Sequence, residues 1–241
     1  MDSSVDRRLF DRRLYFAIAI LFPAIILLGF ARTYYLKGFF ATPPLPSGLV
    51  HLHGLVMTAW VVLFVVQVAL VSTKRIRLHQ KLGYSSIALA VLIIATSLPT
   101  ALRAAKYGSA STPPAIPPLS FLLIPTFDLV MFVLFFGAAI LYRRRPAAHK
   151  ALMLLTVLNF LPPALARIPI ASLQASGPVW FFGFPMLLAL LCLTLDARRH
   201  GRVNRVLAVG TVALVAGYVA RLALMTTAAW LSLAAWLVTF V

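Results

Sequence analysis

The histidines of this chain are the residues whose chemistry is easiest to name, because a neutral imidazole binds transition metals and haem iron. One of them begins a series in which steps of four and three residues place five side chains on one face of a helix: His53, Met57, Trp60, Phe64 and Gln67. The interval from His53 to Gln67 is about four helical turns, a separation at which one helix can address two stacked haems. Gln67, however, stands where the second histidine ligand would be. Packing of an aromatic helix face is the alternative interpretation of the series.

Three further histidines extend the set of candidate ligands. His51 lies two residues before His53, and on a regular helix the two side chains point about 200° apart, so they can share a metal only if the helix begins irregularly. His79 and His149 each precede an apolar segment and could bind haem or a metal together with His53. They could equally be loop residues in contact with lipid phosphate. Any haem would be non-covalent, because the chain has no CxxCH motif.

An acidic residue within an apolar segment is the second feature with possible chemistry. Asp128 lies deep in such a segment, and a carboxylate in hydrocarbon requires a cationic partner or a proton. Arg103, Arg167 and Arg221 are the candidate partners. We predict Arg167, because its segment follows that of Asp128 after a short turn and must run antiparallel beside it. A structural ion pair and a proton-handling or ligand-binding site both fit; Asn159 would add a further polar group.

The elements that must position these residues are membrane-spanning helices. Hydrophobic residues make up 62% of the 241 residues and charged residues 11%, which is the composition of a membrane protein. Apolar segments of about 20 residues, the length that crosses a bilayer, lie at 14–31, 49–72, 82–102, 119–142, 151–170, 178–195 and 206–226. The sequence therefore predicts an all-α polytopic bundle of about seven helices, forming one transmembrane domain over 1–241. Residues 1–13 would be its short cytoplasmic N-terminal segment, and similar His-containing turns suggest three hairpins at 49–102, 119–170 and 178–226.

The basic residues predict the orientation of this bundle. Most of the 22 Lys and Arg residues lie in four short segments on one side of the predicted helices, around Arg12, Arg75, Arg144 and Arg202. This bias places the N-terminus in the cytoplasm and, with seven spans, the C-terminus outside. A net charge of +17 distributed in this way indicates contact with anionic lipids rather than nucleic acid. We expect the first span to be retained rather than cleaved as a signal, because its apolar run is long.

Several classes of protein are excluded or disfavoured by absent motifs. The chain has no GxSxG, HExxH, Walker or dinucleotide-binding sequence in a suitable context. Cys192 is the only cysteine, lies within the sixth span and is expected to be a small core residue. The last span contains Arg221 but no lysine, so a retinal Schiff base has no amine on which to form.

Short motifs in spans 2 to 5 resemble those of uncharacterised bacterial multi-pass membrane families. The motifs are His51-Leu52-His53-Gly54 with Trp60 and Gln67, Leu78-His79-Gln80-Lys81-Leu82-Gly83, and His149-Lys150-Ala151-Leu152-Met153 with Pro163 and Arg167. The arrangement is also loosely similar to oxidase-assembly proteins and to membrane b-type cytochromes. The resemblance implies a redox or haem-associated role in the bacterial cytoplasmic (inner) membrane, with a respiratory-chain or other membrane protein as partner.

Two functional hypotheses follow from these observations. In the first, His53, His79 and His149 hold a non-covalent haem or a transition metal in a redox or respiratory-assembly protein. In the second, Asp128 and Arg167 form the centre of a proton-coupled or small-solute transporter, with Gln67, Asn159 and Arg221 as further intramembrane polar groups.

Overall fold

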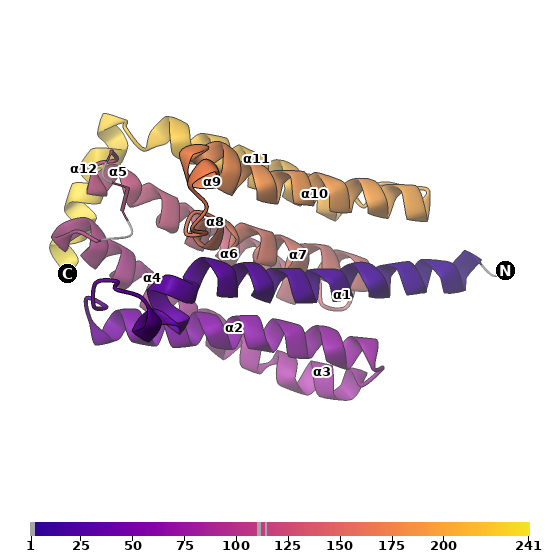
Figure 1. The fold of residues 1–241 in the computed structure, drawn as a ribbon. Coiled ribbons are helices and arrows are strands. Elements are labelled where there is room, and N and C mark those ends of the chain that lie inside the picture. The colour runs from indigo at the N-terminus through magenta and orange to yellow at the C-terminus, as the bar shows by residue number, and fades with distance from the viewer. Residues whose placement is uncertain (1–2, 110–111, 114) are drawn as a thin grey trace. The chain divides into compact units, whose positions relative to one another are not determined.

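The structure is a computed structural model that describes residues 3–109, 112–113 and 115–241, with side chains from residue 13 onward. It is 81% helical, and its described residues contain no strand. Within the described residues, seven helical segments are long and apolar enough to cross a membrane: Arg13–Tyr35, Gly48–Ser72, Ile76–Tyr107, Pro118–Leu141, Pro146–Leu165, Pro178–His200 and Arg205–Leu224. The predicted all-α polytopic class is therefore confirmed (Figure 1).

Several of these spans consist of two consecutive helices. The main helices are α1 (Ser3–Phe30), α2 (Gly48–Ser72), α4 (Ser85–Tyr107), α6 (Leu123–Leu141), α7 (Pro146–Asn159), α10 (Pro178–His200) and α11 (Arg205–Leu224). Short helices precede, follow or connect them: α3 (Ile76–Gly83), α5 (Pro118–Phe121), α8 (Pro162–Leu165), α9 (Ala171–Ala175) and α12 (Ala228–Leu237). A π-helical turn, Ala31–Tyr35, and two 3-10 turns, Lys37–Phe39 and Val238–Phe240, complete the set.

The fifth span is shifted as a whole from its predicted position. It begins at Pro146 and ends at Leu165, whereas hydropathy placed it at 151–170. Pro146 occupies the first turn of α7, where a residue without an N–H group is tolerated. Pro162 and Pro163 begin α8 after a break at Phe160 and Leu161, because proline cannot continue the hydrogen bonds of the preceding helix. Arg167 consequently follows the span instead of lying within it.

The described chain divides into two compact units, each built from three separate segments. Unit 1 consists of Met1–Thr42, Gly54–Ile93 and Leu161–Val203. Unit 2 consists of Pro43–His53, Ile94–Phe160 and Asn204–Val241, so the boundaries fall within α2 and α4 and in the break between α7 and α8. The single transmembrane domain and its three hairpins remain predictions.

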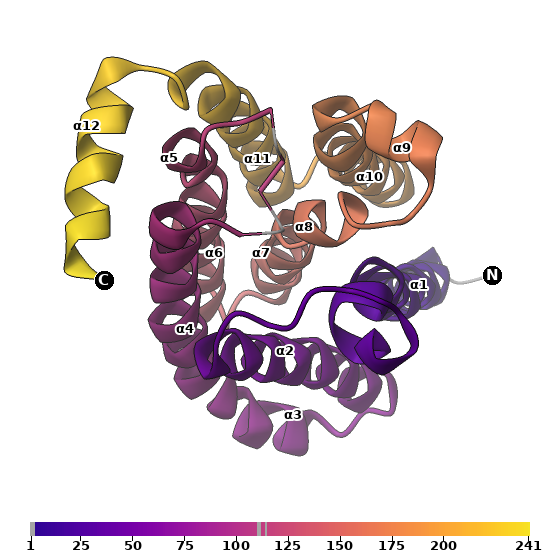
Figure 2. The same cartoon turned by 60° about the vertical axis from the view of Figure 1, so that its left-hand side comes forward.

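Within unit 1, α1 and α8 approach each other closely, and both contact α10 (Figure 2). A Cβ atom added at Gly29 would lie only 2.2 Å from the carbonyl oxygen of Ala164. Only a glycine allows the two backbones to come this close, which is a common device where membrane helices pack. Phe22 of α1 also meets Phe64 of α2 edge to face, with ring centroids 5.7 Å apart.

Within unit 2, α7 packs between α6 and α11 and is almost completely buried. Leu155 and Leu158 of α7 have no exposed surface, and Gly210 of α11 leaves space for the Leu155 side chain. The short helix α12 packs against α5, where the Trp230 indole N–H donates to the carbonyl oxygen of Leu119 at 2.9 Å. The three-helix core of α6, α7 and α11 positions the polar residues described next.

Candidate functional site

A charged pair lies inside the three-helix core of unit 2. Asp128 comes from the first half of α6 and Arg221 from the last turn of α11. Arg221 follows Leu214, Gly217 and Tyr218 on the buried face of α11, at the three- and four-residue steps that keep side chains on one side of a helix. The residue preceding Asp128, Phe127, also faces the guanidinium group. The helix geometry therefore directs both charges into an apolar interior.

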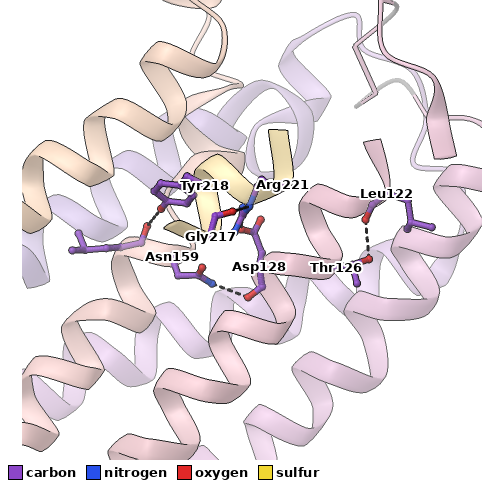
Figure 3. Close-up of polar contacts among 8 residues, drawn as sticks. Leu122, Thr126, Asp128, Asn159, Gly217, Tyr218 and Arg221 are labelled. Atoms are coloured by element: carbon purple, nitrogen blue, oxygen red, sulfur yellow. Dashed lines mark hydrogen bonds and ion pairs between the residues drawn. The ribbon is translucent and has the colours of Figure 1, made fainter. Parts of the chain in front are cut away.

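The two charges form a direct ion pair (Figure 3). The Nη1 atom of Arg221 donates to Oδ1 of Asp128 at 2.5 Å, and Nε donates to the carbonyl oxygen of Gly217 at 3.1 Å. The Arg221 side chain has no exposed surface and that of Asp128 is 8% exposed. The rings of Tyr218 and Phe127 lie 5.0 and 5.6 Å from the guanidinium carbon. Such a pair is held together by charge, hydrogen bonding and the absence of competing solvent.

Asn159 links α7 to the ion pair. Its Nδ2 atom donates to the backbone carbonyl of Asp128 at 2.8 Å, whereas its Oδ1 atom is buried and has no hydrogen-bond partner among the described residues. One residue earlier, the carbonyl oxygen of Leu158 accepts from the Tyr218 hydroxyl at 3.4 Å. Both residues belong to the last turn of α7, immediately before its break. A buried acceptor without a donor costs about 1–3 kcal/mol, so Oδ1 marks a position suited to a donor.

The predicted pairing of Asp128 with Arg167 is wrong. Arg167 follows α8 and belongs to unit 1, where Nη1 donates to the carbonyl oxygen of Pro163 at 2.6 Å. Its guanidinium carbon lies 4.9 Å from the centre of the Phe30 ring. The reason is the shift of the fifth span toward the N-terminus, which carries Arg167 beyond the end of the helix that was expected to hold it. Burial lowers the pKa of Arg167 to about 10, so it remains charged at neutral pH.

The sequence contained a signal for the correct partner. Arg221 was the only arginine that lay well inside a predicted span, so its side chain had to be placed at membrane depth with Asp128. Arg167 and Arg103 lie near predicted span ends, where arginine side chains commonly extend toward water. Depth was a better guide to the partner than the adjacency of consecutive spans.

The candidate ligand histidines differ in their exposure and in the groups that they contact. His53 is half-buried, with Nδ1 at 3.4 Å from Oγ1 of Thr96. His51 is exposed, and α2 is already helical from Gly48. A regular helix directs His51 and His53 about 200° apart, so the irregular helix start that a shared metal requires is not present.

His79 and His149 differ in which ring nitrogen presents a lone pair. The Gln67 side chain is oriented with its amide nitrogen toward His79. In this orientation the amide nitrogen donates to Nδ1 of His79 at 2.6 Å, and the amide oxygen accepts from the Gly83 N–H at 3.0 Å. Neutral His79 then has its proton on Nε2. Nδ1 of His149 instead donates to the carbonyl oxygen of Ala139 at 3.0 Å, which leaves the lone pair on Nε2. The acceptor nitrogen of the neutral ring is therefore Nδ1 in His79 and Nε2 in His149.

No group of three or more His, Cys, Asp or Glu residues that could hold a metal occurs in the part of the chain that the structure describes. Gln67, His79 and the thiol of Cys192 lie in unit 1, and Cys192 is buried within α10 as expected. His53, Asp128, His149, Asn159 and Arg221 lie in unit 2. The structure brings together Asp128, Asn159 and Arg221 from the predicted set of polar residues.

Comparisons of the chain with protein-family models, with curated proteins and with solved structures find no match. The fold itself defines the class: the chain is a multi-pass helical membrane protein.

Proposed function

We propose that this protein is a membrane transporter that moves protons, or a small solute together with protons, through a site centred on Asp128, Arg221 and Asn159. The observation that carries the proposal is the ion pair in the three-helix core. Beside it lie a broken helix and the Oδ1 atom of Asn159, an acceptor to which no described residue donates. Ionisable residues at the centre of a membrane helix cost about 2.5–3.5 kcal/mol on insertion scales and are commonly part of ion or proton pathways.

The break between α7 and α8 supports the same function. Discontinuous helices in transporters provide carbonyl groups and helix ends that bind substrates or ions near the middle of the membrane. Here the last turn of α7 provides Asn159, whose Oδ1 atom can accept a hydrogen bond from water or from a solute hydroxyl or ammonium group. The carbonyl of Leu158 in the same turn already accepts from Tyr218.

The proposed cycle depends on breaking and restoring the ion pair. When a proton binds to the carboxylate of Asp128, Arg221 loses its counter-charge and keeps its bond to the Gly217 carbonyl and its contact with the Tyr218 ring. The contact between α6 and α11 is then weaker, and the two helices can separate. Release of the proton restores the pair. Protonation of one carboxylate is in this way coupled to the packing of two membrane helices.

Infrared difference spectroscopy between acidic and alkaline buffer tests the proposal. The chain has only five acidic residues, all aspartates, so the carboxylic C=O band of one residue can be assigned by substitution. We expect the reconstituted protein to show a band that Asp128→Asn removes and Asp196→Asn leaves in place. If Asp128→Asn is poorly folded, Asp128→Asn with Arg221→Gln removes the same band without leaving an unpaired arginine. A protein that stays folded with no band from Asp128 would overturn the proposal in favour of a structural ion pair.

A haem- or metal-associated redox or assembly role is the second candidate, and His149 favours it. Ligand histidines typically donate their other ring N–H to a carbonyl or carboxylate group, as His149 does to Ala139. His53 would be the further ligand to consider within unit 2. A Soret band that shifts on reduction and is lost in His149→Ala would support this role, whereas a haem-supplied protein without the band would contradict it.

For location, we propose the bacterial cytoplasmic membrane, with the N-terminus in the cytoplasm. The regular concentration of Lys and Arg in alternate turns supports this orientation. Anionic lipids would be the partners of these turns.

A further inference from the structure

The side chain of Arg167 is a half-buried cation that the structure holds in place by uncharged groups. One of its five N–H groups donates to the carbonyl of Pro163, and the Phe30 ring covers the guanidinium. Among the described residues, no carboxylate contacts it. A cation withdrawn from water in this way gains from an anionic partner.

None of the aspartates that the structure describes in unit 1 can be that partner. Asp196 lies near the C-terminal end of α10, where it pairs with His200 at 3.3 Å. The other end of α10 is the one near Arg167, because the Trp180 indole donates to the Leu165 carbonyl at 3.1 Å. The distance from Trp180 to Asp196 along the helix is about 24 Å. Asp11 is similarly about 28 Å from Phe30 along α1, and Asp6 lies further toward the N-terminus of the same helix.

The position of the guanidinium is set by rigid contacts. Gly29 of α1 lies directly against Ala164 of α8, which places the next residue, Phe30, beside Arg167. The close approach of the backbones leaves little freedom for the ring to move away. The remaining N–H groups of the guanidinium form the planar edge that binds a carboxylate or phosphate with two parallel hydrogen bonds.

We infer that Arg167, held by Phe30 and Pro163 in unit 1, is a binding site for an oxyanion, either the phosphate of an anionic lipid headgroup or a free phosphate or carboxylate. The site lies just beyond the end of the fifth span, where a headgroup or a solute from the aqueous phase can reach it. It is separate from Asp128 and Arg221 and does not depend on the transport function proposed for them.

The test measures thermal unfolding of the full-length protein in an uncharged detergent. One arm titrates phosphatidylglycerol against phosphatidylcholine, and the other titrates inorganic phosphate against chloride at equal ionic strength. We expect an anion-specific rise in melting temperature, with the half-saturating concentration raised about tenfold or more in Arg167→Gln. A response to phosphatidylglycerol alone identifies a lipid site, and a response to phosphate identifies a site for free oxyanions.

Two variants make the result specific. Arg103→Gln is the matched control, because Arg103 is an exposed guanidinium over the ring of Tyr107, at 5.4 Å; its response should equal that of the wild type. Arg167→Lys keeps the charge but loses the planar edge, so its affinity should fall between those of wild type and Arg167→Gln. It also provides the comparison if Arg167→Gln does not fold.

The inference is overturned if neither anion stabilises the wild type more than its control, or if both Arg167 variants respond normally. Asp128→Asn with Arg221→Gln should keep the full response, which separates this test from that of the transporter.

Discussion

Asp128 and Arg221 are each other's charged partner inside unit 2. The guanidinium has no exposed surface and the carboxylate very little, so water cannot replace either partner. Two charges brought together in this way add little net stability compared with apolar residues, but one left alone is strongly unfavourable. The asymmetry between losing one charge and losing both gives a direct test of the pair.

We predict that Asp128→Asn lowers the stability of the protein by about 3–5 kcal/mol, because it leaves Arg221 charged and buried. In detergent this corresponds to a fall in melting temperature of roughly 6–20 °C for a chain of this size. Asp128→Asn with Arg221→Gln should recover part of the loss, because no charge is then without a partner. Melting curves of the wild type, Asp128→Asn, Arg221→Gln and the double variant check the prediction.

Asp196→Asn is the matched control for this experiment. Asp196 also has a side-chain partner, His200, at 3.3 Å, but both side chains are partly exposed, at 23% and 26%. Exposed pairs contribute about 0–1 kcal/mol, so this variant should unfold close to the wild type. A double variant no more stable than the sum of the two single losses would show that Asp128 and Arg221 are not coupled.

The sequence indicated these residues but not their arrangement. A lone aspartate in an apolar segment can be recognised as a candidate functional residue from the sequence, because the free-energy cost of placing its carboxylate in lipid is large. Its partner depends on the depth and rotation of three helices, and those in turn depend on where the proline residues end α7. Asn159 was recognisable as a polar group, but its bond to the Asp128 carbonyl depends on tertiary packing and leaves no periodic signal in the sequence.

Among the elements, α1 and α8 show how strongly one residue can control helix packing. We predict that Gly29→Ala destabilises the protein by about 1–3 kcal/mol or more, because the added methyl group meets backbone atoms of Ala164 that cannot rotate away. The melting temperature in detergent measures this effect. It should be accompanied by weaker oxyanion binding at Arg167, since Phe30 follows Gly29 directly.

Gly183→Ala provides the control within the same unit. Gly183 lies inside α10, and a Cβ atom added there meets nothing within 4 Å. Alanine is favoured over glycine in a helix by up to about 1 kcal/mol, so this variant should be as stable as the wild type or slightly more stable. Equal losses in Gly29→Ala and Gly183→Ala would contradict the role assigned to the close approach.

Elements were more predictable than the contacts between them. The first, second, fourth and seventh predicted spans agree with the structure to within four residues at each end, because length and hydropathy determine them directly. The third is longer than predicted because the helical segment begins at Ile76, in α3, and ends at Tyr107, and the sixth ends at His200 instead of 195. The fifth was misplaced because its hydrophobic run continues through Pro162 and Pro163, where the helix does not. The short helix α12 was not predicted, because its ten residues are too few to cross a bilayer and its stability comes from packing on α5.

For the whole molecule, the distribution of Lys and Arg predicts which loops face the cytoplasm. We expect a cysteine at Ser176 to react with a membrane-impermeant reagent in intact cells, and a cysteine at Arg144 to react only after the membrane is opened. Both positions are exposed in the structure. Gel-shift labelling measures the reaction, and the opposite pattern would show that the bundle has the inverse orientation.

The native sequence is well suited to this experiment. Cys192 is the only cysteine in the chain and is 2% exposed within α10, so it should give little background. Unaltered protein is therefore the control for both single-cysteine additions. Labelling of Cys192 itself in intact cells would indicate that α10 is not packed as described.

The 93-residue separation of Asp128 and Arg221 also matters while the protein is being synthesised. At about 5–20 residues per second, the ribosome needs roughly 5–20 s after Asp128 before it adds Arg221. During that time α6 enters the membrane with its carboxylate but without the cation that later neutralises it. The high mean hydropathy of the span, 2.3, outweighs the cost of one polar residue on insertion. Insertion of α6 is thus followed by a separate step, in which α11 enters beside α6 and α7 and the two charges meet for the first time.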